Sequence, residues 1–444
     1  MTIVSEQRAK EILAKALAFS KADACECRLE AKVGGNIRYA RNTVSTAGQE
    51  SDMVLAVRSI FGKREGIATI NEYDAASLQK VVRRSEELAR LSPENPEQMP
   101  LFGVQKYLPS NTYFDATAQV TPDYRASAAD VSITPSKKNK LVASGFLEDE
   151  VTFVAILNSK GLFAYNKATN VDFSVTIRTE DGRGSGWASA NYSDTARLDT
   201  GLTSQIAIKK SIGSVDAKEM EPGKYTVILE PAASYNLIRN MMYNFNQRAA
   251  DEGRSFLTNK LKKGEAGPIN KLGQKMFDER VNLYSDPQHP IAPTAPFNDE
   301  GYPLQRMDWV KNGVIANMPN TPYWAKHTGA AYSPRGNNFI MEGGDESLED
   351  MIKNTRRGVL VTRMWYIRTL DRQTLLYTGL TRDGTFYIEN GKIKYPIKNF
   401  RFNESPIVML NNVEALGKPE RIEGNMIPPM KIRDFTFSSL SDAV

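Results

Sequence analysis

Residues 150–179, EVTFVAILNSKGLFAYNKATNVDFSVTIRT, decide the fold class. Apolar and polar residues alternate along much of this stretch, which is the pattern of a strand with one buried face. The turn-forming residues Asn158–Ser159–Lys160–Gly161 interrupt the alternation. The stretch therefore predicts a β-hairpin. Strand-like sequence extends over about residues 141–192, and the turn residues DGRGSG at 181–186 end the second strand of this hairpin.

The first 95 residues predict a helix–strands–helix unit. Residues 5–20 place apolar side chains at helical spacing, and a second helix begins at Asp74 and ends before Pro93. Alternating segments lie between the two helices, with a hairpin turn predicted at GKREG, residues 62–66. This order of helices and strands is typical of α+β domains.

The rest of the chain predicts a β-rich middle and a mixed C-terminal part. Residues 92–135 are rich in Pro, Ser, Thr and Asn, which predicts a linker or an irregular connection, and a helix is expected near 199–211. After Pro222–Gly223, the strand KYTVILE opens the last part. Further downstream the sequence predicts hairpin turns at Asn312–Gly313, Asp383–Gly384 and Asn390–Gly391. It also predicts one helix at residues 346–357, with Asp345 as its cap.

These patterns predict an α+β protein of three domains. The first is the helix–strands–helix domain, residues 1–95. The second comprises the linker and a β-rich central domain, residues 96–221. The third is a mixed, β-rich C-terminal domain, residues 222–444.

The charge balance argues against nucleic acid as a ligand. The chain has 57 Lys+Arg and 52 Asp+Glu, a net charge of +5 over 444 residues, and its densest basic runs lack interleaved aromatic residues. The N-terminus lacks the order of a signal peptide, and no uninterrupted apolar run approaches the roughly 18 residues that span a bilayer. We therefore expect a cytoplasmic protein that does not contact a membrane.

Cysteine and histidine offer little material for a metal site. Cys25 and Cys27 stand at i and i+2; a redox pair or half a metal site is one interpretation, and two small buried side chains is the one we favour. His289 and His327 are far apart and have no ligand residue beside them. A zinc site of soft ligands is therefore hard to assemble.

The acidic pair in FNDEGYP, residues 297–303, is predicted to be structural. Asp299 and Glu300 are adjacent, and neighbours on an extended segment point to opposite sides, so they do not easily share an ion or a proton. Before Gly301 they suit a turn. An unfamiliar active site built from this run and the RGNN turn at 335–338 stays open as an alternative.

The stretch YNLIRNMMYNFNQRA, residues 235–249, raises the question of catalysis. Its spacing is helical, with asparagine and arginine among the apolar residues, so it is either a packing helix or the scaffold of a site. No nucleophile elbow, Ser-His-Asp order or dinucleotide-binding fingerprint is recognisable elsewhere in the sequence. The residues alone leave both interpretations open.

Several long segments resemble the TldD/PmbA family, whose members are historically labelled modulators of DNA gyrase. They follow the family's order and cover most of the chain: residues 37–89, PFNDEGYPLQRMDWVKNGVIANM at 296–318, HTGAAYSPRGNNFIMEGG at 327–344, LEDMIKNTRRGVLVT at 348–362, and residues 380–402. No single segment is a catalytic fingerprint. The resemblance implies a relation to metallopeptidases.

The resemblance also implies where a metal site would lie. In the TldD branch, a strand matching YTVILE leads into a helix with a His-Glu-x-x-x-His motif; its histidines and a late cysteine hold zinc, and its glutamate is the general base. By position, the histidines fall on Arg239 and Asn244 and the glutamate on Asn240, and no cysteine follows Cys27. A fixed cation at a ligand position repels Zn²⁺. We therefore expect no catalytic residue and no metal in this chain, as in the TldE/PmbA-like branch.

The function implied is that of a non-catalytic subunit of a TldD-type zinc metallopeptidase complex for intracellular peptide processing. Its partner would be a TldD-type paralogue, which alone would carry zinc, or a second copy of this chain. The alternative is a stand-alone homodimer that binds peptides or a regulatory protein without catalysis. A third possibility, direct action on gyrase or DNA, is disfavoured by the near-balanced charge.

Four residues are candidates for substrate binding: Arg239, Asn244, Arg335 and Asn337. Arg239 could pair with a peptide carboxylate in a bidentate manner. The structural alternative, which we favour, is that a nearby Asp or Glu satisfies this arginine.

Overall fold

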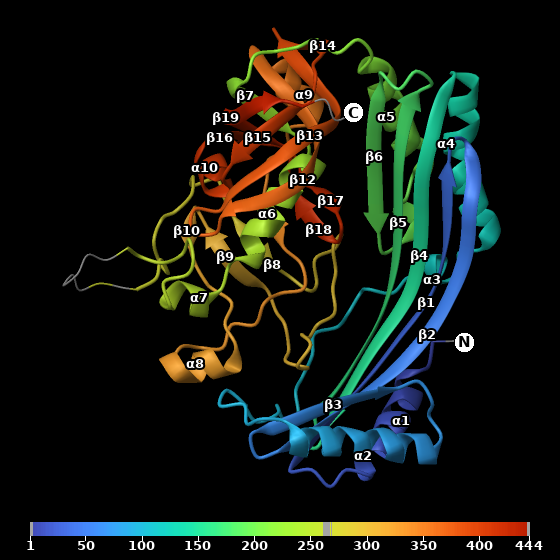
Figure 1. The fold of residues 1–444 in the computed structure, drawn as a ribbon, viewed down its shortest axis with the longest axis vertical. Helices are drawn as coiled ribbons and strands as arrows, with labels where there is room; N and C mark the ends of the chain where they lie inside the picture. Colours follow the sequence, from blue (N-terminus) through green and yellow to red (C-terminus); the bar gives the residue numbers. More distant parts are fainter. Residues whose placement is uncertain (1–2, 261–266, 268, 442–444) are drawn as a thin grey trace.

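The chain forms an elongated molecule in which a long curved sheet stands beside a rounder C-terminal body (Figure 1). The computed structural model describes residues 3–260, 267 and 269–441. Helices and strands are mixed in each part, and the middle and C-terminal parts are rich in strands. The predicted α+β class is confirmed. No helix in the described ranges is long and apolar enough to cross a membrane.

The long sheet contains six antiparallel strands in the order β3-β2-β1-β4-β5-β6. Their bounds are β1 Ala24–Ala40, β2 Thr43–Phe61, β3 Arg64–Ile70, β4 Leu141–Asn158, β5 Phe163–Thr179 and β6 Ser185–Tyr192. The β4–β5 hairpin predicted from the sequence is confirmed, paired from Leu157↔Phe163 to Leu141↔Thr179. Because β1 pairs with β4, the boundary predicted near residue 95 separates segments that share one sheet.

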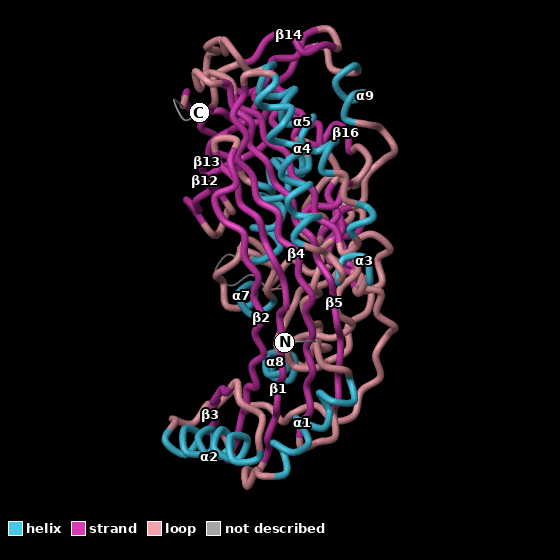
Figure 2. Tube along the Cα trace, turned by 90° about the vertical axis from the view of Figure 1, so that its right-hand side faces the viewer, coloured by secondary structure: helices cyan, strands magenta, loops and turns pink. Residues whose placement is uncertain are grey.

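Helices cover the long sheet in two groups, one toward each end of its strands, as Figure 2 shows. Near one end, α1 (Glu6–Ala18) and α2 (Ala75–Leu91) form an apolar core with β1, β2 and β4. Toward the other end, α4 (Pro122–Lys138) and α5 (Thr200–Gly213) form a second core with β1 and β4–β6; α3 (Asp115–Ala118) is a single turn. The predicted helices at 5–20, after Asp74 and near 199–211 are confirmed, and Ser5, Asp74 and Asp199 cap them.

Helix α4 corrects the last part of the irregular connection predicted at 92–135, whereas residues 92–114 lie outside the helices and strands, as predicted. Thr121 caps its first turn and Pro122 occupies the first helical position, which suits proline. Four of the six buried residues of α4 are alanine or serine. Among them, Ser132 hydrogen bonds to Tyr39 at 2.8 Å and to Ser204 at 2.8 Å. The apolar periodicity that identifies most helices is therefore weak in this segment.

The C-terminal body contains two further sheets. One has the order β12-β7-β19-β15-β13-β14, with β16 beside β19, and the other the order β10-β9-β8-β11-β18-β17. Strand bounds are β7 Gly223–Leu229, β8 Leu283–Ser285, β9 Met307–Lys311, β10 Val314–Ile315, β11 Ile340–Met341, β12 Arg357–Asp371, β13 Leu376–Glu389, β14 Lys392–Pro396, β15 Phe400–Glu404, β16 Val413–Leu416, β17 Glu420–Ile422, β18 Asn425–Ile427 and β19 Met430–Leu440. Helix bounds are α6 Pro231–Tyr243, α7 Gln247–Asp251, α8 Pro322–Thr328, α9 Leu348–Lys353 and α10 Pro406–Asn411, with a short 3-10 turn at Thr195–Arg197 before α5.

Two predictions in this body are wrong in detail. The helix predicted at 346–357 is the shorter α9, capped by Ser347 instead of Asp345. The Asp383–Gly384 pair is not a hairpin turn: both residues have positive φ, but they form a bulge within β13 opposite β12. The bulge kinks the strand instead of ending it. The turns at Asn312–Gly313 and Asn390–Gly391 are confirmed.

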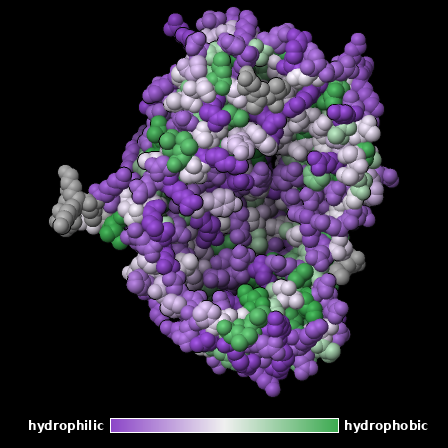
Figure 3. Space-filling view, viewed as in Figure 1, coloured by the Kyte–Doolittle hydropathy of each residue, from purple (hydrophilic) through white to green (hydrophobic). Residues whose placement is uncertain are grey.

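The two bodies meet where β6 packs against β13 and β17. Nearer the other end of the sheet, Arg28 pairs with Asp299 at 3.2 Å, and Glu97 pairs with Arg248 at 2.7 Å. Figure 3 shows a hollow between the bodies that is lined largely by hydrophilic residues. The candidate site opens beside this junction.

Candidate functional site

Helix α6 is a packing helix with one polar side. It begins at Pro231, before the stretch singled out in the sequence, and ends at Tyr243, with Asn244 as its C-cap. Leu237, Ile238, Met241 and Met242 are buried in the largest apolar cluster, with side chains from both C-terminal sheets. This packing fixes the position of the helix and therefore of the polar side chains on its other side.

A cavity of about 310 Å³ lies beside the C-terminal half of α6. Its lining residues come from five separate segments: Tyr235, Arg239, Met242, Tyr243, Ser285, Trp309, Arg335, Gly336, Asn337, Asn338, Phe339, Glu423 and Asn425. Three of the four predicted substrate-binding residues, Arg239, Arg335 and Asn337, are thus brought together. Asn244 is not among the lining residues.

Arg239 is held by an ion pair and by two aromatic rings. Its Nη1 lies 3.2 Å from a carboxylate oxygen of Glu423, and its guanidinium lies 5.6 Å from the ring centre of Tyr235 and 6.0 Å from that of Tyr243. Its Nε is buried and has no hydrogen-bond partner. The structural alternative for Arg239, a nearby acidic partner, is therefore present, but the pair does not use the Nε donor of the guanidinium. Burial and the neighbouring Glu423 carboxylate raise the pKa of Tyr235.

Glu423 reaches Arg239 from the tip of the β17–β18 hairpin. It has φ +45°, followed by Gly424 at +75°, the positive values of a tight two-residue hairpin turn. Asn191 on β6 holds this hairpin, because its side-chain oxygen accepts hydrogen bonds from the Gly424 N–H at 3.1 Å and the Arg421 Nε at 3.2 Å. One wall of the cavity is thus fixed to the long sheet.

Arg335 closes the C-terminal end of α6. Its guanidinium donates hydrogen bonds to the backbone carbonyls of Met242, Tyr243 and Phe245, at and just beyond the last turn of the helix. Of these, the Met242 carbonyl also accepts from the backbone N–H of Phe245 at 3.1 Å. A cation here also suits the helix dipole, although burial lowers the pKa of Arg335. Asn337 donates to two loop carbonyls, those of Ala295 and Phe297. Both predicted binding residues thus have structural partners.

The three positions that would match the family's metal motif do not form a metal site here. Arg239 supplies a guanidinium and Asn240 a carboxamide, neither of which is a usual zinc ligand. Asn244 turns away from the cavity and donates to the Asn240 carbonyl at 2.8 Å and the Tyr377 hydroxyl at 3.4 Å. Among the residues that the structure describes, no group of three or more His, Cys, Asp or Glu could hold a metal ion. These residues do not fit zinc.

The other sequence candidates lie apart from the cavity. Cys25 and Cys27 are buried on β1 with free thiols, the interpretation we favoured. His289 lies in a loop where its Nδ1 accepts from the backbone N–H of Ala292 at 3.1 Å, and burial lowers its pKa. The Asp299–Glu300 pair lies in a turn, as predicted.

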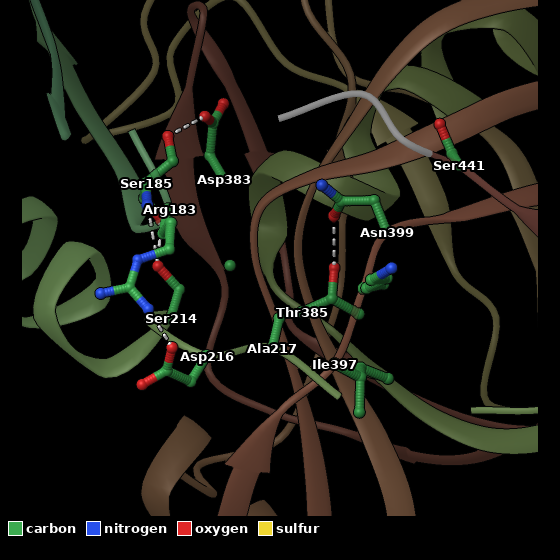
Figure 4. A pocket seen from close by; sticks show the side chains of 12 residues that line it. Arg183, Ser185, Ser214, Asp216, Ala217, Asp383, Thr385, Ile397, Asn399 and Ser441 are labelled. Carbon is green, nitrogen blue, oxygen red and sulfur yellow. Dashed lines mark hydrogen bonds and ion pairs between the residues drawn. The ribbon is translucent and has the colours of Figure 1, made fainter. Parts of the chain in front are cut away.

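Sequence reasoning missed further cavities at the junction of the bodies, among them the following two. One, of about 320 Å³, shares Glu423 with the first and contains Asp172, whose pKa burial raises to about 6. The other, of about 380 Å³, is shown in Figure 4, where Ser185 points toward Asp383. Their residues come from distant segments, so no local motif marks them in the sequence.

Comparison with known proteins places this geometry in a family. Three regions match domains of the PmbA/TldA metallopeptidases: residues 25–89 match domain 1, 118–214 the central domain and 222–439 the C-terminal domain. Metalloprotease PmbA of Escherichia coli O157:H7 is 20% identical over 97% of this chain and 98% of its own length.

Solved structures show the same fold. TldE from Thermococcus kodakarensis has a TM-score of 0.83 at 18% identity, covering 97% of this chain and 99% of that one. A Thermotoga maritima protein described as a candidate modulator of a DNA gyrase has a TM-score of 0.84 at 16% identity, covering 97% and 100%. The chain belongs to the PmbA/TldD metallopeptidase family.

Proposed function

We propose that this chain is a non-catalytic, TldE/PmbA-like subunit of a TldD-type zinc metallopeptidase complex that processes peptides in the cytoplasm. In this proposal the chain helps to hold the peptide, and its partner supplies the zinc and the general base. The single observation that carries it is the chemistry at the motif positions. A guanidinium and two carboxamides stand at Arg239, Asn240 and Asn244, where a catalytic subunit needs two imidazoles and a carboxylate.

The cavity beside α6 supports the peptide-holding role. It combines aromatic side chains with a few convergent polar groups, which is the usual composition of a ligand site. The neighbouring cavity that contains Asp172 shares Glu423 with it, so the two offer adjoining room along α6. An extended peptide segment would place its side chains in such adjoining spaces.

Strand β2 supports association with a partner subunit. Residues 43–52 are exposed on both faces of the sheet. They pair with β1 on one side, whereas β3 pairs only with Leu55–Phe61 further along. A strand edge of this kind offers unpaired backbone groups to another chain.

The test is a pull-down of the tagged full-length chain from its own cells, followed by mass spectrometry and metal analysis. Recovery of a paralogue with a His-Glu-x-x-x-His motif, at about equal amount and with zinc in the complex, is the expected result. Stoichiometric zinc together with peptide cleavage by the purified chain alone would overturn the proposal.

A second candidate is a stand-alone homodimeric regulator that binds peptides or a protein without catalysis. The observation that favours it is that two similar solved structures, from Thermotoga maritima and Bacteroides thetaiotaomicron, are described as candidate modulators of DNA gyrase. Recovery of the chain alone, as a dimer by native mass spectrometry, would favour this candidate. A supercoiling assay with gyrase and the purified chain would then test the regulatory role.

A further inference from the structure

Arg239 lines the cavity, and part of its hydrogen-bonding capacity is unused. The guanidinium has five N–H donors, and its one ion pair uses Nη1. Its buried Nε has no partner. Arg335, the other cation of this cavity, donates to three backbone carbonyls instead. Arg239 is therefore the cation of this cavity that a ligand can engage.

The ion pair between Arg239 and Glu423 is poised for exchange. Their side chains are 36% and 57% exposed, and a single contact of 3.2 Å joins them. Ion pairs this exposed contribute little to stability. A carboxylate that approaches from the cavity could bond the two terminal nitrogens of the guanidinium together, a bidentate geometry that arginine favours.

The backbone of Glu423 is also unusual. Its φ of +45° is a value that favours Gly, which has no Cβ, or Asn and Asp, whose side chains can hydrogen bond to the local backbone; it costs energy for Glu. In this conformation, at the hairpin tip held by Asn191, the Glu423 carboxylate reaches over the cavity and occupies the cation. The site thus contains its own competing anion.

We propose that Arg239 is a carboxylate-binding residue and that a ligand carboxylate displaces Glu423 from it. Tyr235 and Tyr243 flank the guanidinium of Arg239 and limit the orientations that it can adopt. The inference rests on the proposed function in taking the ligand to be a peptide. Its carboxylate comes from the peptide's C-terminus or from an acidic side chain, and the chemistry at Arg239 is the same in both cases.

The experiment measures fluorescence anisotropy of the full-length chain with three labelled hexapeptides. Two share one apolar sequence, as free acid and as C-terminal amide; the third is the amide with a central aspartate. We expect the free acid to bind about tenfold more tightly than its amide, the scale of a charge-assisted hydrogen bond. A matching gain in the aspartate peptide alone would assign the site to acidic side chains.

Variants of Arg239 and Glu423 test whether this ion pair causes the preference for the free acid over the amide. Arg239→Gln should abolish the difference between acid and amide, whereas Glu423→Gln should tighten acid binding about threefold or more, because the competing anion is gone. Arg254→Gln is the matched control: this exposed arginine pairs with Glu252 and does not line the cavity. It should leave all affinities unchanged.

Two outcomes separate this inference from the proposed function. Peptides that bind with no preference for a carboxylate, or a preference that survives in Arg239→Gln, would overturn the inference and leave the peptide-binding role intact. If no hexapeptide binds, the inference is tested by the shift in melting temperature that N-acetylphenylalanine and its amide each produce. Stabilisation by the acid only, lost in Arg239→Gln, supports the carboxylate site; equal effects of the two overturn it.

Discussion

The Ser185 hydroxyl donates a hydrogen bond of 2.7 Å to the carboxylate of Asp383, 198 positions later in the chain. Ser185 begins β6 of the long sheet, and Asp383 lies at the β13 bulge in the C-terminal body. The other carboxylate oxygen of Asp383 accepts from Arg363 at 3.1 Å. The buried Asp383 carboxylate therefore joins the two bodies through its hydrogen bond to Ser185.

Removal of this carboxylate is expected to weaken the junction. Asp383→Ala leaves Arg363 without its charge partner and should lower the free energy of unfolding by about 3 kcal/mol, since the pair is shielded from water. Ser185→Ala removes a hydroxyl only and should cost about 1 kcal/mol. Urea denaturation of both single variants and the double variant measures their coupling. A double variant whose loss equals the sum of the two would show that the residues act independently.

Gly35 is expected to be irreplaceable for a steric reason. A Cβ on this β1 residue would lie 2.1 Å from Cζ of Arg125, a buried side chain that forms a bidentate pair with Asp149. Gly35→Ala should displace Arg125 and destabilise the chain by about 2–4 kcal/mol. Thermal unfolding beside Gly48→Ala checks this, because a Cβ at Gly48 meets no atom closer than 3.8 Å. Equal melting temperatures for the two variants would contradict the steric argument.

The Asp172 carboxyl should make stability depend on pH. Burial, with the negative charges of Glu423, Glu148 and Glu150, raises its pKa from 3.8 to about 6. The folded chain therefore holds this proton after the unfolded chain has lost it. The protonated Asp172 carboxyl therefore contributes fully to the free energy of unfolding below about pH 4. This contribution, about 3 kcal/mol, is lost as the pH rises toward 6.

Substitution of Asp172 by its uncharged isostere tests this dependence. In Asp172→Asn the fall in stability between pH 4 and 6 should shrink, and the variant should be more stable than the wild type at pH 7. Urea midpoints at intervals from pH 4 to 8 provide the measurement. Parallel pH curves for the two proteins would show that Asp172 titrates normally.

Arg335 is expected to act on the helix end more than on a ligand. Arg335→Met leaves the Phe245 carbonyl without its side-chain donor and the Met242 carbonyl with only the backbone N–H of Phe245, so the free energy of unfolding should fall by about 2 kcal/mol. Hydrogen exchange should rise in residues 241–247. The peptide preference for a carboxylate should persist, because Arg239 remains. Loss of that preference with unchanged hydrogen exchange would instead make Arg335 a ligand-binding residue.

The long hairpins could be predicted because their signals are local. The turn at Asn158–Gly161 and the alternation around it lie within one short stretch, and the caps Ser5 and Asp74 lie next to their helices. Helix α4 was missed because its buried face is small and polar. The Asp383–Gly384 pair was misassigned because positive φ serves a bulge and a hairpin turn equally well.

The candidate site could be predicted only in part. Resemblance to the family brought attention to Arg239, Arg335 and Asn337, which line one cavity. Glu423 was missed because nothing near it in the sequence connects it with α6; the β17–β18 hairpin and Asn191 bring it there. Asn244 was placed in the helix, but the helix ends one residue earlier.

The end of α6 gives the last prediction, which concerns reconstruction of the metal motif. The variant Arg239→His, Asn240→Glu, Asn244→His restores the residue types of a His-Glu-x-x-x-His helix. Position 244 is the C-cap and points toward Tyr377, away from the cavity that contains Arg239. The two new imidazoles would therefore not converge, and no cysteine follows Cys27 to act as a third ligand.

We expect this triple variant to bind less than one zinc ion per chain at micromolar zinc and to cleave no peptide, because a zinc site needs at least three ligands in tetrahedral positions. Isothermal titration with zinc, beside the wild type, is the measurement. Stoichiometric binding with micromolar affinity or better would show that the end of α6 can rewind to bring position 244 into the cavity. The position of residue 244 would then no longer be an obstacle to a metal site, and the residue types alone would explain its absence.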